Sequence, residues 1–477
     1  MKVLITIMRL ELLQLWRDST SRVLGLLLLV LTVYAVGSST AGYSEAEREH
    51  HHLTETARDK MVHQKPTSPH MAGHYGHIAF KPATFLQAVD PGVNVFTGTT
   101  VRVEAHTQNR DVFAPAGGRS SLVRFGEFSF SLLLQVVVPL LILFTCYRSV
   151  LADRANGSLK ILLCQGISMR MLVLGRACAY SGVFVGYLLL AAAGYGAVFL
   201  LRHEGAGDGD GILLRLLALV LLYALYYMLL VGSVVFASAF SRDASGLLAG
   251  LLSVWLIITI ILPKAAANIG EQHAPLPTSL EFAEGISSRR GDGINGHDRS
   301  NPHTAAFIDS VKRAYGVDSV EALPVKIGGL LMQADEEYNN RLYDEALGGI
   351  EAIIERQNRI GSLSSYLNPF MAVRNLSMAL AGTDMHQHFH FTGSVELYRR
   401  ELVATLNAQD ALRESAYKDG KGKLTGRFWE SSSDFEYAPP SLRWSLGHYV
   451  HELVAVWLWC FLVFFMIYFL SNKIRVS

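Results

Sequence analysis

The sequence of 477 residues predicts an α-helical polytopic membrane protein with six transmembrane helices and a large, mostly helical extracytoplasmic domain built from two insertions. Two observations lead to this fold class. Half of the residues (50%) are apolar, and several apolar runs reach about twenty residues, the length that crosses a bilayer as a helix. Two long polar segments lie between such runs, so the chain combines membrane helices with substantial parts outside the membrane.

The apolar segments have a consistent predicted sidedness. They cover residues 22–38, 128–147, 177–201, 212–240, 247–263 and 448–471. The loop 148–176 between the second and third segments is rich in arginine and lysine, which predicts a cytoplasmic location. An even number of spans then places both termini, including the tail 472–477, in the cytoplasm. Arg215, near the outer end of the fourth segment, is expected to extend toward the membrane surface.

The first twenty residues suit a helix lying on the cytoplasmic membrane surface. Residues 1–21 set Lys2, Arg9, Glu11 and Arg17 among leucines and isoleucines, an amphipathic pattern. A cleaved signal peptide is the alternative, with small residues near 38–41 as its cleavage site. The preceding segment is long and carries acidic residues, which favours a retained helix.

The two insertions, residues 39–127 and 264–447, contain none of the four cysteines, so each needs an apolar core rather than disulfides. The second insertion reads as helical from Thr304, and a long helix is expected over Pro324–Arg359. The first insertion is less regular. Short extended pieces are expected in it at His77–Pro82, Val93–Thr97 and Thr100–Glu104.

The basic loop carries a further pattern. An acidic residue, a Gly-Ser pair, a short apolar stretch and a Ser-x-Arg follow one another between two membrane segments. This arrangement resembles the coupling helix of type-2 ABC transporter permeases, although Gly166 stands where that family usually has proline. The resemblance implies that the loop contacts a separate ATPase through Asp153, Arg154, Gly157, Ser158, Lys160, Ser168 and Arg170. An ordinary positively charged cytoplasmic loop is the alternative.

A narrower resemblance rests on the polar insertions. The runs Pro69–Pro82, Asp90–Gly98, Val103–Asn109 and Leu367–Asp384 together resemble an uncharacterised bacterial permease family that is described only as a domain of unknown function. The genes of that family often lie beside an ABC ATPase and a TonB-dependent receptor. The resemblance covers most of the chain and names no substrate.

These resemblances imply the partners of the chain. The sequence has no phosphate-binding loop of the form G-x-x-x-x-G-K-[ST], so ATP and magnesium are expected on an ATPase partner and no catalytic residues on this chain. A second copy or a homologous permease, membrane lipids and a periplasmic protein or TonB-dependent receptor system are the other expected partners. The near-neutral charge gives no indication of nucleic acid. The expected location is the bacterial inner membrane.

The histidines are the chemically distinctive residues, and by the predicted topology all 17 lie outside or at the outer membrane face. Neutral imidazole binds borderline metals, so copper or zinc is favoured over magnesium. A helix starting at Ser68-Pro69 would place His70, His74 and His77 on one face, whereas the run from 386 to 390 alternates as on a strand. The candidate ligands are His70, His74, His77, His106, His386, His388 and His390. Structural hydrogen bonding is the alternative role.

Three hypotheses of function follow. The first is an ATP-driven permease whose extracytoplasmic domain handles a metal or metal chelate. The second is mechanotransmission, in which nothing crosses the membrane and the outer domain acts on a periplasmic or outer-membrane partner. The third is a metal-binding membrane scaffold without coupling to ATP.

Overall fold

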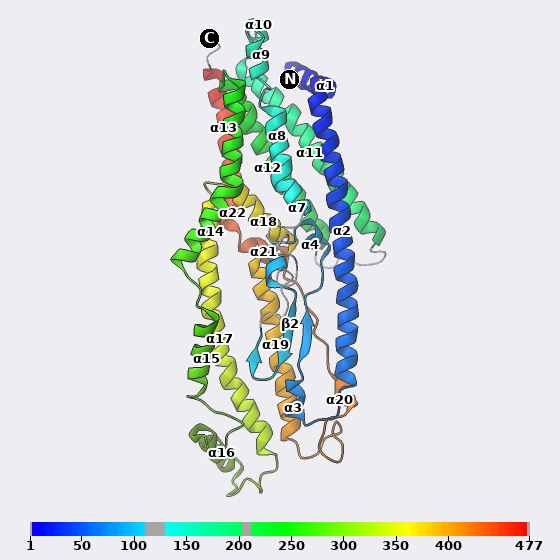
Figure 1. Cartoon of the computed structure of the whole chain (residues 1–477), viewed down its shortest axis with the longest axis vertical. Coiled ribbons are helices and arrows are strands. Elements are labelled where there is room, and N and C mark those ends of the chain that lie inside the picture. The colour runs from blue at the N-terminus through cyan, green and yellow to red at the C-terminus, as the bar shows by residue number, and fades with distance from the viewer. Residues whose placement is uncertain (1, 110–128, 203–210, 475–477) are drawn as a thin grey trace.

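The computed structural model describes residues 2–109, 129–202 and 211–474. The molecule is elongated (Figure 1). A bundle of apolar helices occupies one half, with α1, α9 and α10 at its far end. The other half, here called the distal lobe, is formed by residues 45–108 and 264–447. The described ranges leave out residues 110–128, which contain the predicted boundary between residues 127 and 128. They also leave out the last three residues of the predicted tail.

The chain is mostly helical, as predicted. The helices that belong to the apolar half are α1 (Lys2–Arg17), α2 (Ser19–Val62), α7 (Phe130–Leu132), η2 (Leu133–Val137), α8 (Val138–Cys146), α9 (Leu151–Ala155), α10 (Ser158–Cys164), α11 (Met169–Arg202), α12 (Ile212–Phe240), α13 (Ala244–Leu256), η4 (Ile257–Ile261), α22 (Val450–Phe465), η5 (Met466–Leu470) and η6 (Ser471–Lys473). The elements of the distal lobe are α3 (Pro69–His74), β1 (His77–Phe80), α4 (Phe85–Val89), α5 (Asn94–Thr97), β2 (Thr100–Glu104), β3 (Thr107–Gln108), α14 (Leu262–His273), α15 (Ser279–Arg290), α16 (Pro302–Tyr315), α17 (Ile327–Ser364), α18 (Pro369–Ala381), α19 (Met385–Ala411), α20 (Gly426–Ser431) and α21 (Leu442–Gly447).

Within the described residues, six helical stretches are long and apolar enough to cross a membrane, which confirms the predicted polytopic class. They are Ser19–Val62, Phe130–Ala155, Met169–Val198, Ile212–Phe240, Ala244–His273 and Val450–Lys473. Many of their large apolar side chains, such as Leu190 and Phe461, face outward, as lipid contact requires. The first stretch is longer than its predicted span, because α2 continues as one helix of 44 residues into the distal lobe.

Two of these stretches widen into a π-helical turn just before a proline. The turns η2 and η4 end two residues before Pro139 and Pro263, respectively. Proline has no N–H and its ring crowds the carbonyl four residues earlier, so a widened turn accommodates it without ending the helix. Each stretch therefore crosses the full length of the bundle.

A small antiparallel sheet forms the centre of the distal lobe. Strand β1 pairs with β2, with His77 opposite Val103, and β2 pairs with β3, with Glu104 opposite Thr107. Val101 and Val103 pack on α19 with Phe391 and Val395 in a core separate from that of the membrane bundle. The strands expected near His77 and Thr100 are therefore present.

Three local expectations are wrong. Residues 94–97 form the helical turn α5, which closes on Gly98 at a positive φ of 76°. Residues 386–390 lie in α19, where Asp384 caps the backbone N–H groups of His386 and Gln387 and starts the helix. Arg215 does not extend toward the membrane surface but is buried. Its guanidinium donates to the last carbonyl groups of α18 and to Pro440 O, the latter at 2.7 Å.

The bundle and the lobe meet at the loop after α4. Asp90 Oδ2 accepts hydrogen bonds from Ser377 Oγ (2.6 Å) and Gln135 Nε2 (3.2 Å), and Thr383 Oγ1 donates to Asp90 O (2.9 Å). Two runs that carry the narrower resemblance, 90–98 and 367–384, are thus in direct contact. They join the first insertion to the second at the level of the membrane bundle.

Candidate functional site

Four histidines converge in the distal lobe. One nitrogen of each of His70, His74, His106 and His297 lies within 4.8 Å of the others. His74 Nε2 is 3.1 Å from His70 Nε2, and His297 Nε2 is 3.2 Å from His106 Nε2. We refer to these residues as the histidine cluster. Three of them are among the candidate ligands predicted from the sequence, whereas His297 was missed.

Local backbone structure positions the first three histidines. Ser68-Pro69 starts α3 as predicted, and the spacing of four residues places the rings of His70 and His74 on one face, 4.9 Å apart. His106 occupies the turn between β2 and β3 with φ at 63°. Such a conformation is uncommon outside glycine, and here it directs a buried side chain toward α3.

His297 comes from the loop between α15 and α16. Thr304 closes this loop by accepting from Asn295 N and donating to Asn295 O, at 3.2 and 2.8 Å. Gly296 packs so closely on α17 that a Cβ atom would lie 3.1 Å from Leu331 O. The loop is therefore held against α17 while the side chain of His297 stays exposed. A lone histidine in a glycine-rich loop carries no sequence signal that links it to distant partners.

Carboxylate and amide groups lie behind the histidines. Glu336 Oε1 lies 2.8 Å from His106 Nδ1, and Asn407 Oδ1 lies 3.5 Å from His70 Nδ1. Arg399 Nη1 donates to Glu336 Oε2 at 3.0 Å and pairs with Glu396 through two further hydrogen bonds. Both Glu336 and Arg399 are buried, so the arginine balances a carboxylate that would otherwise be costly to bury.

Burial lowers the pKa of three of the four imidazoles. Burial lowers the pKa of His70 to about 4, and the neighbouring histidines contribute to this shift. Burial and His106 likewise lower the pKa of both His74 and His297. Burial raises the pKa of Glu336, but His106 and Arg399 outweigh that effect and lower it to about 2. The cluster thus combines three imidazoles of lowered pKa with one ionised carboxylate.

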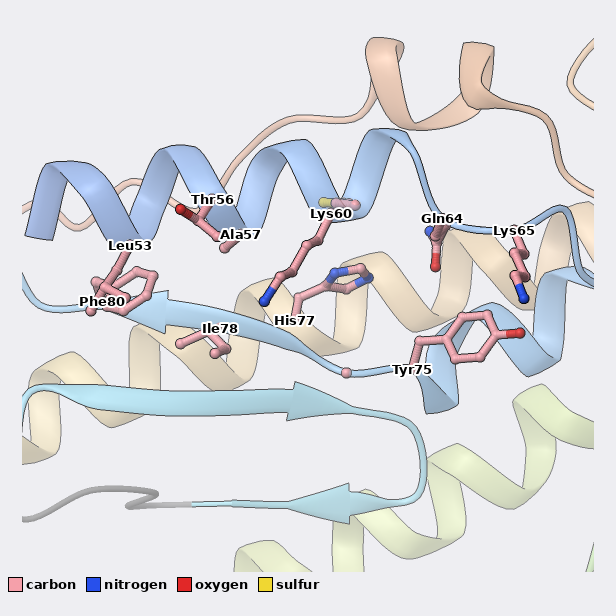
Figure 2. A pocket seen from close by; sticks show the side chains of 12 residues that line it. Leu53, Thr56, Ala57, Lys60, Gln64, Lys65, Tyr75, His77, Ile78 and Phe80 are labelled. Atoms are coloured by element: carbon pink, nitrogen blue, oxygen red, sulfur yellow. The ribbon is translucent and has the colours of Figure 1, made fainter.

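His77 is not part of the cluster. It lies on β1, after α3 has ended, so it does not continue the helical face of His70 and His74. Figure 2 shows its ring between β1 and the end of α2, beside a hollow of about 370 Å³. Its ring centroid is 5.1 Å from that of Trp429, and burial lowers its pKa to about 4.

The three histidines of α19 are also separate from the cluster. A helix turns about 100° per residue, so residues 386 and 390 share a face while 388 points away from them. His386 lies 4.4 Å from the ring of His448 at the membrane end of the lobe, and His390 Nδ1 is 3.1 Å from Tyr437 OH. His388 is buried.

At the opposite end of the molecule, α9 and α10 form a short helical hairpin that projects beyond the membrane helices (Figure 1). Gly157 joins the two helices with φ at 80°, and Ser158 Oγ donates to Asp153 Oδ1 at 2.8 Å. Arg154 Nη2 donates to Ala239 O of α12 at 2.6 Å. Lys160 and Ile161 are exposed, Ile161 by 61%.

The base of this projecting hairpin is held by a buried arginine that the sequence did not single out. Arg176 of α11 pairs with Glu11 of α1 (Nε–Oε1, 2.5 Å) and with Asp153 of α9, and it donates to Ser149 O. Ser238 Oγ of α12 accepts from the backbone N–H groups of Val150 and Leu151, both at 3.1 Å. The hairpin is thereby joined to three membrane-associated helices.

The last two predicted loop residues lie at the start of α11. Ser168 Oγ accepts from Met171 N at 3.2 Å. The guanidinium of Arg170 lies 4.3 Å from the ring centroid of Tyr468, near the end of the last membrane helix. The structure therefore brings all seven predicted loop residues to one end of the molecule. Side chains that contact neighbouring elements are those of Asp153, Arg154, Ser158 and Arg170, whereas Lys160 is open to solvent.

The model of a domain of unknown function, DUF3526, matches residues 280–438. This match agrees with the expected uncharacterised domain family, and it covers about a third of the chain. No curated protein and no solved structure matches the chain. The matched range contains His297, Glu336 and Arg399, whereas the other three histidines of the cluster precede it.

Proposed function

We propose that this chain is the membrane subunit of an ATP-driven machine of the type-2 ABC class. In this proposal a separate ATPase binds the projecting hairpin on the cytoplasmic side, and ATP hydrolysis moves the distal lobe outside the membrane. The observation that carries the proposal is the hairpin of α9 and α10, which offers an exposed surface and is anchored at its base by Arg176.

The anchoring favours transmission of force rather than independent motion of the hairpin. A displaced loop transmits movement only if its contacts with the membrane helices persist. The buried ion pairs of Arg176 and the hydrogen bonds of Ser238 link the hairpin to α1, α11 and α12. Movement at Gly157 would therefore be passed to the bundle.

The connection from the bundle to the lobe is equally direct. At a rise of about 1.5 Å per residue, the 44 residues of α2 extend about 66 Å without interruption. Figure 1 shows α2 passing along one side of the molecule from the apolar half into the distal lobe. A tilt of its membrane part would displace its far end, where Arg58 pairs with Asp434 at 3.0 Å.

Within this class, mechanotransmission without a cargo is the second candidate, and one observation favours it. The hollow between α7, α11 and α12 measures only about 20 Å³, which is about the space of a single water molecule. A cargo larger than water would not fit this hollow, which favours mechanotransmission or a pathway formed with a second copy or a homologous permease. Helix α13 has no fully buried side chain within this chain, although Leu251, Leu252 and Trp255 pack partly against the core, and its exposed face is available to such a copy.

A photo-crosslinking amino acid at Ile161 tests the proposed partner. Because this side chain is exposed on the hairpin, it should crosslink in native membranes to a protein that carries an ABC-type phosphate-binding loop. The same probe at Leu280, an exposed apolar position of the distal lobe, is the matched control and should not capture that ATPase. An Ile161 probe that yields only lipid adducts, or captures the ATPase no better than the Leu280 probe, would refute the proposal.

A further inference from the structure

The two insertions contribute to the histidine cluster together. His70, His74 and His106 come from the first insertion, and His297 comes from the second. Three separate backbone elements, α3, the turn between β2 and β3, and the loop before α16, direct their rings to one point. Four imidazoles are rarely gathered from such distant parts of a chain unless something at their centre stabilises the arrangement.

The groups behind two of the rings determine which nitrogen carries the proton. Glu336 beside His106 Nδ1 and Asn407 beside His70 Nδ1 are oxygen acceptors, so each Nδ1 is expected to hold the hydrogen. The Nε2 atoms of both rings are then unprotonated and present lone pairs to the centre. A carboxylate behind a histidine is also the common arrangement around protein-bound metal ions.

The spacing suits a small tetrahedral ion. Metal–nitrogen bonds of about 2.0–2.1 Å place the four nitrogens of a tetrahedral site about 3.3–3.4 Å apart. Two Nε2 pairs of the cluster are already 3.1 and 3.2 Å apart, and the remaining separations reach 4.8 Å at most. The exposed ring of His297 leaves a route from solvent.

The donor set selects the class of ion. Four imidazole nitrogens suit borderline divalent ions such as Zn²⁺, whereas Mg²⁺ requires oxygen donors and Cu⁺ prefers sulfur. No cysteine belongs to the cluster within the described part of the chain. Zn²⁺ also accepts tetrahedral geometry without an electronic preference for a planar one.

We propose that His70, His74, His106 and His297 bind one borderline divalent transition-metal ion, of the class of Zn²⁺, and that this ion ties the first insertion to the second. The site does not depend on the ATPase, so an experiment on metal binding tests it independently of the function proposed above. Because the ion contacts α3, the strand turn and the loop on α17 together, its loss would remove one link between the β2–β3 turn and that loop, while the hydrogen bond from His106 N to Glu336 of α17 remains.

Zinc binding to the full chain in membrane nanodiscs tests the site. After removal of metals by a chelator, titration with Zn²⁺ alone should show one high-affinity equivalent per chain by elemental mass spectrometry and calorimetry. His297→Ala and His106→Ala should abolish that equivalent. His303→Ala is the matched control, because His303 is also exposed and lies six residues further along the same segment, outside the cluster.

His297 provides the decisive variant, since replacing an exposed loop side chain should leave the fold intact. Glu336→Gln should weaken zinc binding by roughly 10- to 100-fold while all four ligands remain. Zinc should also slow amide hydrogen exchange in residues 100–108 and 293–298 of the wild type and leave exchange in His297→Ala unchanged. The proposal is overturned if the wild type binds no zinc, if His297→Ala binds it as tightly as His303→Ala, or if Mg²⁺ competes at similar concentrations.

Discussion

Gly92 shows how a single residue fits the two insertions together. Its φ is 51°, and a Cβ atom would lie 2.4 Å from Thr383 O, at the contact between the runs 90–98 and 367–384. Val93 N donates to the same carbonyl at 2.9 Å. Glycine is therefore required both for its backbone conformation and for the close approach of these two segments of the chain.

Gly92→Ala should destabilise the protein by about 1–3 kcal/mol, because the new methyl group forces the loop away from Thr383. The measurement is the denaturation midpoint in detergent. Gly420→Ala is the control, since Gly420 is exposed with no atom near its Cβ position and has an ordinary φ. Equal midpoints for the two variants would contradict the argument.

Arg176 is the second residue with a clear expected cost. Arg176→Met would leave Glu11 and Asp153 without their cation, and removing one partner of a buried ion pair typically costs about 3–5 kcal/mol. Adding Glu11→Gln should recover part of that loss, whereas Arg148→Met, at an exposed position, should change little. Thermal unfolding of Arg176→Met, Glu11→Gln, the double variant and Arg148→Met, each compared with the wild type, measures this coupling, and strictly additive effects of the first two substitutions would show that Glu11 and Arg176 do not interact.

Sequence alone predicted three of the four residues of the histidine cluster but also named four histidines that lie elsewhere. His70 and His74 could be predicted from the sequence because a helix start and a spacing of four residues are local signals. His106 depends on a strand turn with an unusual φ, and His297 depends on how a loop folds on α17. These are long-range contacts, which residue spacing does not encode.

At the scale of elements, hydropathy identified all six membrane helices because their signal is carried by about twenty consecutive residues. Short segments were less predictable. Residues 94–97 form a helical turn instead of a strand. Residues 386–390 belong to α19, because a capping aspartate and the packing of the helix outweigh alternation over five residues. Continuation of α2 beyond the membrane was not visible in hydropathy.

Arg215 links α12 to the end of α18, and its removal should loosen that contact. Its guanidinium donates to Ala379 O and Leu380 O, both at 3.4 Å, in the last turn of the helix, where Ala379 O also accepts from Gly382 N. Arg215→Leu should cost about 1–3 kcal/mol and accelerate hydrogen exchange in the last turn of α18. Arg443→Leu, in the neighbouring helix α21 but exposed, is the control. Unchanged exchange in α18 would contradict this role.

At the scale of the whole molecule, the proposed topology assigns opposite ends to opposite sides of the membrane. Cys164 ends α10 and is exposed at the end of the molecule near both chain termini, whereas Ser300 is exposed in the distal lobe. In intact cells, a membrane-impermeant maleimide should label a Ser300→Cys variant but leave Cys164 unlabelled until the membrane is opened. The reverse pattern would invert the topology and place the hairpin away from any cytoplasmic ATPase.

The unbroken path of α2 has a consequence for how this chain can vary in length. Each residue added to a helix turns everything beyond it by about 100° and advances it by about 1.5 Å. One extra residue between Tyr43 and Arg58 would thus turn the contact of Arg58 with Asp434 out of alignment, whereas seven residues, close to two full turns, would nearly restore the angle. Seven residues would also advance Arg58 by about 10.5 Å along the helix axis, so neither insertion would keep its contact with Asp434, and the length of this stretch should be fixed by that contact.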